Sequence, residues 1–181
     1  PFADEPSNHG LQLTDTRMLY NMTLSSDKAR LQVAIHAIGD RSIDLVLDLY
    51  KSVASKNGMR DRRFRIEHAQ HLAPGTAARF GEQEVIASVQ PDLLLDDANS
   101  APKKLGAERA HGGSYLFQKT TMKDHTYFAT QWSGYEFGNS LQVADINLLG
   151  SIKTAMKRVP PGWEDDWIPS ERIILKDALN G

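Results

Sequence analysis

Two of the six histidines stand at the ends of consecutive predicted strands. His36 lies near the end of the apolar run 31–37, and His68 ends the alternating run 63–68, one strand and one helix later. A neutral imidazole binds zinc and similar divalent ions. Because the carboxyl ends of the strands in a (β/α) barrel meet at one mouth, we expect both side chains to face one metal site. The alternative for each histidine taken alone is a structural role.

Other polar residues near these strand ends are weaker candidates for the site. Asp40 follows the first predicted strand and is expected to hold a turn or cap the next helix, with a ligand role as the alternative. Glu67 directly precedes His68, so strand alternation predicts that it points to the opposite face and packs or pairs with an arginine. No spacing assigns a partner to three further histidines: His71, His111 and His125.

Composition limits the chemistry that the chain can perform. Its 181 residues include no cysteine, which excludes disulfides, thiolate zinc sites and a cysteine nucleophile. Any metal ion must therefore be held by His, Asp or Glu. No glycine-rich phosphate loop follows a predicted strand and no G-x-S-x-G turn is present, which argues against nucleotide-binding and serine-hydrolase functions.

Charge and hydropathy restrict the partners. The 21 basic and 23 acidic residues give a net charge of −2, so the sequence does not predict binding to nucleic acid. Four arginines lie close together but among acidic neighbours, and they are expected to form a solvated approach to a strand: Arg60, Arg62, Arg63 and Arg65. No apolar run approaches the roughly 18 residues of a membrane span. The compartment and the oligomeric state are left open.

The segments that would position the two histidines alternate between strand and helix. Strands are predicted at 31–37, 63–68 and 84–90, and helices at 15–28, 41–56, 74–83 and 108–123, with Thr14 as the N-cap of the first helix. This alternation predicts an α/β fold with parallel strands. The polar stretch 92–106 is predicted to be a long loop, either a wall of the site or a solvated surface loop. Further on, the pattern indicates a strand near 126–130, a helix from Asp145 and a last helix over 170–179.

Four motifs together resemble the metal-dependent amidohydrolase superfamily, in its formamide-deformylase-like branch. They are AIHAIGDR at 34–41, RIEHAQ at 65–70, IASVQP at 86–91 and VADIN at 143–147. The sequences of residues 27–71 and 163–179 are similar to those of plant members of this family that are linked with far-red light signalling. The resemblance implies that residues 1–181 form one partial domain, the C-terminal half of a distorted TIM (β/α)8 barrel, from a fragment or truncated gene product. The segment 120–142 departs from the family pattern and is a candidate for translated intron sequence or for a faulty gene model.

The same resemblance implies a function for the parent protein. It predicts a metal-dependent hydrolase acting on non-peptide, amide-type carbon–nitrogen bonds of a small-molecule substrate, with a divalent ion, zinc preferred, held by His36 and His68. The family's first-strand histidine pair and bridging ligand would lie before Pro1, and Trp132 aligns with the eighth-strand aspartate. No catalytic residue is therefore assigned, and this chain is expected to be incomplete for catalysis. The alternative function is a non-catalytic regulatory or binding protein of the same fold.

Overall fold

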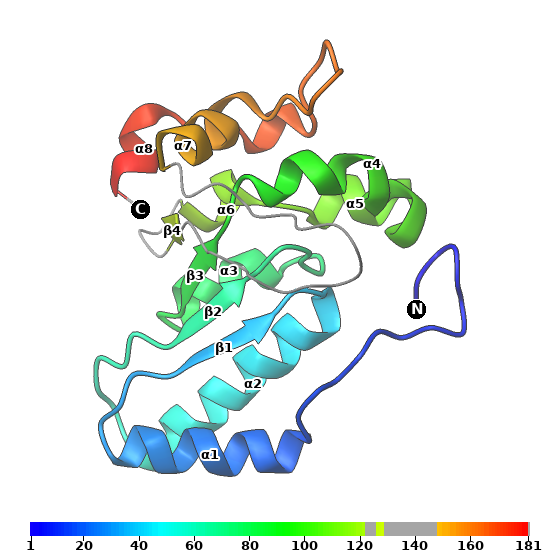
Figure 1. Cartoon of the computed structure of the whole chain (residues 1–181). Helices are drawn as coiled ribbons and strands as arrows, with labels where there is room; N and C mark the ends of the chain where they lie inside the picture. The colour runs from blue at the N-terminus through cyan, green and yellow to red at the C-terminus, as the bar shows by residue number, and fades with distance from the viewer. Residues whose placement is uncertain (122–125, 129–147, 181) are drawn as a thin grey trace.

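The computed structural model of the chain describes residues 1–121, 126–128 and 148–180 (Figure 1). Four strands and a set of helices follow one another along these residues: α1 (Thr16–Lys28), β1 (Ala34–Ala37), α2 (Asp40–Asn57), β2 (Arg65–His68), α3 (Thr76–Glu82), β3 (Ile86–Val89), α4 (Leu93–Leu105), α5 (Ala107–Gly113), α6 (Phe117–Thr121), β4 (Thr126–Phe128), α7 (Leu148–Lys157), the 3-10 helix η1 (Pro169–Glu171) and α8 (Leu175–Asn180). None of the described helices is both long and apolar enough to cross a bilayer.

The strands form one parallel sheet in the order β1-β2-β3-β4. Helices separate consecutive strands along the chain, so the fold is α/β, as the alternation of segments predicted. Because the strands are parallel, their carboxyl ends lie along one edge of the sheet. Figure 1 shows α2 between α1 and β1, with α4 to α8 gathered near the end of β3.

Burial of apolar side chains explains why these segments form helices and strands. In α2, residues at helical spacing lose nearly all contact with water: Ile43, Val46, Leu47, Tyr50 and Val53. They pack with the sheet residues that face the helices, including Ile66 and Ala87, which are both fully buried. This core fixes the positions at which β1 and β2 end.

The first helix begins one residue later than predicted, because its cap is Asp15 and not Thr14. The Asp15 carboxylate accepts hydrogen bonds of 3.0 Å from the backbone amides of Arg17 and Met18. A side chain in this position satisfies amides that the helix leaves without partners. The helix therefore begins at Thr16.

The prediction of a loop over 92–106 is wrong. Most of this stretch is the helix α4, whose inner face carries Leu94, Ala98 and Ala101, each no more than 3% exposed. Their spacing is helical, but polar residues stand between them, of which Asp96 and Asn99 are exposed, and these made the helical pattern hard to recognise in the sequence. The neighbourhood of the strand ends is thus covered by an ordered helix and not by a loop.

The single helix predicted over 108–123 is two helices, α5 and α6. The chain between them turns at Tyr115, whose φ is 51°, in the left-handed region. Here the chain runs beside the segment that follows β2: the Leu72 amide donates to the Gly113 carbonyl at 2.8 Å, and the Tyr115 amide to that of Gln70 at 2.7 Å. These bonds replace helix continuation and join α5 to the carboxyl end of β2.

Several predicted features fall partly or wholly beyond the described residues. The strand expected near 126–130 is present as β4, whereas Trp132, Asp145 and most of the atypical segment 120–142 lie outside the described ranges. The last predicted helix, 170–179, is divided into η1 and α8.

Candidate metal centre at the strand ends

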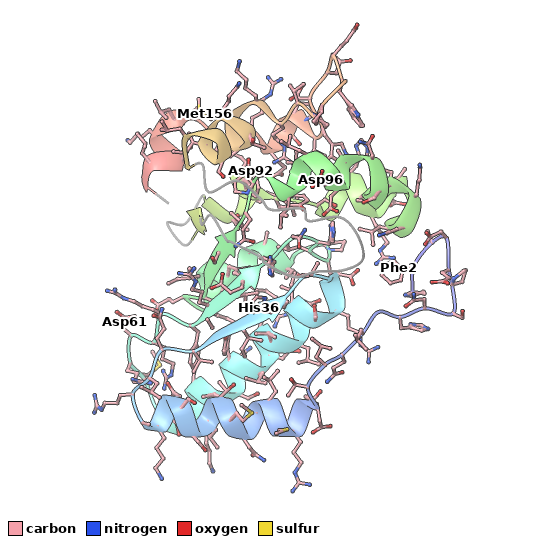
Figure 2. The ribbon with its side chains drawn as sticks, viewed as in Figure 1. Phe2, His36, Asp61, Asp92, Asp96 and Met156 are labelled. Atoms are coloured by element: carbon pink, nitrogen blue, oxygen red, sulfur yellow. The ribbon has the colours of Figure 1, made fainter. Side chains whose placement is uncertain are left out.

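The structure brings His36 and His68 together. Nδ1 of His36 lies 3.0 Å from Nε2 of His68, and the ring centroids are 4.9 Å apart at an interplanar angle of 56°. His36 projects from β1, in the middle of the molecule in Figure 2, and His68 is the last residue of β2. Two residues that are far apart in the sequence thus present ring nitrogens to one point near the carboxyl ends of the strands.

The backbone at the end of β2 explains how His68 reaches its neighbour. The register pairs His36 with Glu67, and His68 with Ala37, so a regular strand would place His36 and His68 on opposite faces. Instead His68 has φ of 77° and Ala69 has φ of 44°, both left-handed. This departure from strand geometry turns the His68 ring toward His36.

Glu67 therefore lies differently from the prediction. As the register partner of His36, it shares the face of the sheet with that histidine and does not point away from it. Its carboxylate pairs with the Arg65 guanidinium, as expected, and Arg65 also donates to the Ser88 hydroxyl at 2.7 Å. The alternation argument failed because it assumed that the strand stays regular through His68.

Burial affects the charge of the histidine pair. Loss of water around the ring lowers the pKa of His68, and the neighbouring His36 lowers it further. Gln90 and Glu67 oppose this fall without reversing it. At neutral pH the His68 ring is therefore uncharged, which is the protonation state that a metal ion requires of an imidazole ligand.

The two nitrogens lie slightly closer together than two ligands of one zinc ion would. Two nitrogens bound to one tetrahedral zinc ion at about 2.1 Å lie about 3.4 Å apart, whereas the observed separation is 3.0 Å, so the rings must move apart slightly to share one ion. Among the described residues, no group of three or more His, Asp or Glu side chains could enclose a metal ion. The described part of the chain therefore offers two candidate ligands, fewer than the four that a zinc site usually has.

A second polar cluster lies just beyond β2, and the sequence did not reveal it. The Asp97 carboxylate of α4 accepts hydrogen bonds from the Tyr115 hydroxyl at 2.6 Å and from the Gln70 amide at 3.0 Å. His71 has Nδ1 2.9 Å from the Ser114 hydroxyl and Nε2 3.7 Å from the Asp97 carboxylate. Ser114 is fully buried, so this cluster joins elements of the fold and presents no accessible nucleophile.

Asp40 is occupied by protein partners. Its carboxylate accepts from the Arg41 amide at 2.7 Å and from the Arg109 guanidinium at 2.8 Å. Burial alone would raise the pKa of Asp40, but these two donors lower it below its usual value. The geometry agrees with the interpretation of Asp40 as a residue that holds the start of α2.

The arginine cluster also binds acids within the chain. Arg60 and Arg62 both reach the buried carboxylate of Asp27, and Arg63 pairs with Asp61. The Arg62 side chain is only 7% exposed, so the expectation of solvated side chains is wrong for this residue. Its guanidinium is used inside the fold.

Residues 3–131 match the sequence profile of the Amidohydrolase family (Amidohydro_3). The chain belongs to this family. The chain is 57% identical to the "Protein LONG AFTER FAR-RED 3" of Arabidopsis thaliana over 178 residues, which is 98% of this chain and 29% of that protein. The "Putative amidohydrolase YtcJ" of Bacillus subtilis (strain 168) is 30% identical over 109 residues, or 60% of this chain and 20% of its own.

Two solved structures have the same fold as this amidohydrolase-family chain. Both are uncharacterized metal-dependent hydrolases, from Pyrococcus furiosus and Pyrococcus horikoshii OT3, with TM-scores of 0.77 and 0.78 and identities of 24% and 25%. The match covers 99% of this chain but only 33% and 34% of those structures. The chain thus spans about a third or less of each relative and structure that it resembles.

Proposed function

We propose that this chain is the C-terminal half of a distorted TIM barrel within a metal-dependent hydrolase that acts on amide-type carbon–nitrogen bonds of small molecules. Family membership and the likeness to metal-dependent hydrolases support the reaction class. The single observation that carries the assignment to residues is the 3.0 Å approach of two histidine nitrogens near the carboxyl ends of β1 and β2. Active sites of such barrels lie at this end of the strands.

The arrangement of strands supports the half-barrel proposal. Four parallel strands occur in sequence order in the sheet, as they do in half of an eight-stranded barrel. Within the described residues, β1 and β4 form the two edges of the sheet. A full ring needs about 250 residues, and this chain covers a third of the similar structures. The remaining strands would come from the longer polypeptide.

In this proposal His36 and His68 each contribute one ring nitrogen to a divalent ion, with zinc the preferred candidate. Such an ion, when bound, lowers the pKa of water from 15.7 to about 7 and polarises a carbonyl oxygen. The chain's own contribution is to hold the two nitrogens close together and to keep His68 uncharged through burial. No described residue is assigned as the catalytic acid or base.

Metal content of the full-length protein tests the ligand assignment. We expect the unmodified protein to copurify with or take up one or more zinc equivalents, and the His36→Ala/His68→Ala double variant to lose at least one of them. His111→Ala is the control, since His111 is an exposed residue of α5. Equal metal content in the double variant and in the control would remove both histidines from the metal site.

Activity of the same preparations tests the reaction class. The full-length protein should release amine and carboxylate from at least some members of a panel of small N-formyl and N-acyl amides, and the double variant should not. A protein that binds zinc through the two histidines but hydrolyses no member of the panel would favour the second candidate, a non-catalytic regulatory or binding protein. That candidate is supported by the small donor set, since only two potential ligands come together in the described part of the chain.

A further inference from the structure

Two polar atoms beside the histidine pair are shielded from solvent and have no hydrogen-bond partner among the described residues. They are Nδ1 of His68 and Oε1 of Gln90. A buried polar atom without a partner costs on the order of 1–3 kcal/mol, so two such atoms near each other call for a structural explanation. One atom is a ring nitrogen that can donate, and the other can only accept.

The sheet places Gln90 next to His68. Gln90 directly follows β3, the neighbour of β2, and the register pairs Glu67 with Ser88, so both residues lie at the carboxyl ends of adjacent strands. Gln90 is only 6% exposed, and its amide acts on the pKa of His68. The Gln90 side chain therefore lies beside the His68 ring.

The orientation of the Gln90 amide is set by its other contact. Its Nε2 lies 3.4 Å from the Ser88 carbonyl, which can only accept a hydrogen bond. The nitrogen must therefore be on the Ser88 side, and Oε1 remains for the histidine. Glu67, the other acceptor near the ring, already has its carboxylate on Arg65.

We propose that Gln90 is a positioning residue for the metal-binding histidine: its Oε1 accepts the Nδ1 proton of His68, so that Nε2 of this ring always carries the lone pair. The metal part of this inference rests on the proposed function, whereas the tautomer does not. Metal-ligating histidines generally donate their second ring nitrogen to such an acceptor, which fixes the tautomer and the direction of the ring.

The proposal also assigns the proton between the two histidines. If Nε2 of His68 has no proton, the 3.0 Å contact must be a hydrogen bond that Nδ1 of His36 donates. To become a ligand, His36 must then give up that proton and take one at its own Nε2, with no net proton change. His36 is exposed, so water can carry this exchange. Because of Gln90, His68 already has the tautomer that binds a metal ion, whereas His36 must change its tautomer first.

Ring ¹⁵N shifts from magic-angle-spinning NMR of the metal-free full-length protein, labelled at histidine, test the tautomer directly. We expect a protonated Nδ1 and a bare Nε2 for His68, assigned by the signals that disappear in His68→Gln. Gln90→Met, which keeps the length but removes the acceptor, should shift the population toward the Nε2-protonated form, and Gln90→Glu should retain the wild-type tautomer. Gln83→Met is the control, because Gln83 follows α3 at the opposite end of β3 and also has a buried Oε1 without a described partner.

Zinc affinity, measured by competition with a chelator, is the second readout. Loss of a residue that orients a metal ligand typically weakens metal binding by about 10- to 100-fold. Gln90→Met should therefore weaken zinc binding by this amount, whereas Gln90→Glu and Gln83→Met should bind zinc about as tightly as the wild type. A wild-type His68 protonated at Nε2, or a tautomer unchanged in Gln90→Met, would overturn the proposal. If the wild type binds no zinc but Gln90→Met still changes the tautomer, the role of Gln90 stands and the proposed metal function falls. Should Gln90→Met not fold, the wild-type and Gln90→Glu spectra decide the matter.

Discussion

The buried carboxylate of Asp27 should be one of the strongest single anchors in this part of the protein. Its side chain, at the end of α1, has no solvent exposure, and it accepts hydrogen bonds from Asn57 at 2.8 Å, from Arg62 at 3.0 Å and from Arg60. These partners lie at the end of α2 and in the segment that leads into β2. Replacing Asp27 by Ala removes the acceptor that joins these segments.

The expected cost follows from what the substitution leaves behind. Arg62 is 7% exposed and would remain as a buried cation without its counter-ion, and breaking a buried pair in this way costs about 3–5 kcal/mol. Arg60 is 26% exposed and regains part of its hydration, so we expect the lower half of that range. Asp61→Ala is the matched control: its pair with Arg63 is 72–73% exposed and is worth about 0–1 kcal/mol.

Urea unfolding of the full-length protein and of both variants, followed by tryptophan fluorescence, measures this difference. Asp27→Ala should lower the free energy of unfolding by about 2 kcal/mol or more relative to Asp61→Ala. Two variants that lie within about 0.5 kcal/mol of each other would refute the argument from burial, since surface substitutions scatter by this amount.

The same carboxylate predicts a pH dependence with a definite sign. Burial alone would raise the pKa of Asp27, but Asn57, Arg60 and Arg62 together lower it below 3.8. A group with a lowered folded-state pKa stabilises the protein above its unfolded pKa and loses this effect as the pH falls through the folded-state value. The gap between wild type and Asp27→Ala should therefore be full at pH 7 and shrink below pH 3.8. A gap that widens as acid is added would contradict the assignment.

Two further predictions concern the segment that follows β2. A Cβ on Gly113 would lie 2.3 Å from the Leu72 carbonyl oxygen, so Gly113→Ala should destabilise the protein by about 1–3 kcal/mol. A Cβ on Gly112 would have open space around it, so Gly112→Ala should stabilise α5 by up to about 1 kcal/mol. Thermal unfolding compares the two variants, and equal melting temperatures would mean that the chain yields at Leu72. Tyr115→Phe removes the 2.6 Å hydrogen bond to Asp97 and should cost about 1.5–3 kcal/mol by urea unfolding; a loss below about 0.5 kcal/mol would show that water replaces the hydroxyl.

Periodicity in the sequence located the elements that have one continuous apolar side and failed where a polar stretch interrupts that side. The helix α2 carries an apolar stripe over 18 residues, and its limits were predicted to within one residue. In α4 the leucines lie only at the two ends, and the stretch 96–104 between them carries two alanines and a proline among polar residues, so that it resembles a loop. Tertiary contacts decided that segment, and a single sequence does not contain them.

The candidate site was predictable only where strand ends determined it. The positions of His36 and His68 in two successive strands were enough to predict that they lie near each other. The cluster around Asp97 was not predictable, because its members come from α4, from the segment after β2 and from the link between α5 and α6. Their meeting depends on the turn at Tyr115, which no local pattern indicates.

The meeting of the two histidines depends on a backbone departure as much as on strand order. Residues held in the left-handed region cost about 1–3 kcal/mol each and persist only where surrounding contacts impose them. Here the contacts that impose it are two backbone hydrogen bonds. The Ala69 amide donates to the Ala37 carbonyl at 3.1 Å, and the His71 amide donates to the Ile38 carbonyl at 3.0 Å. Both bonds tie the chain beyond β2 to the end of β1. The strand that carries His36 therefore also imposes the turn that directs His68 toward it, so the two ring nitrogens keep their separation through bonds independent of any ion between them.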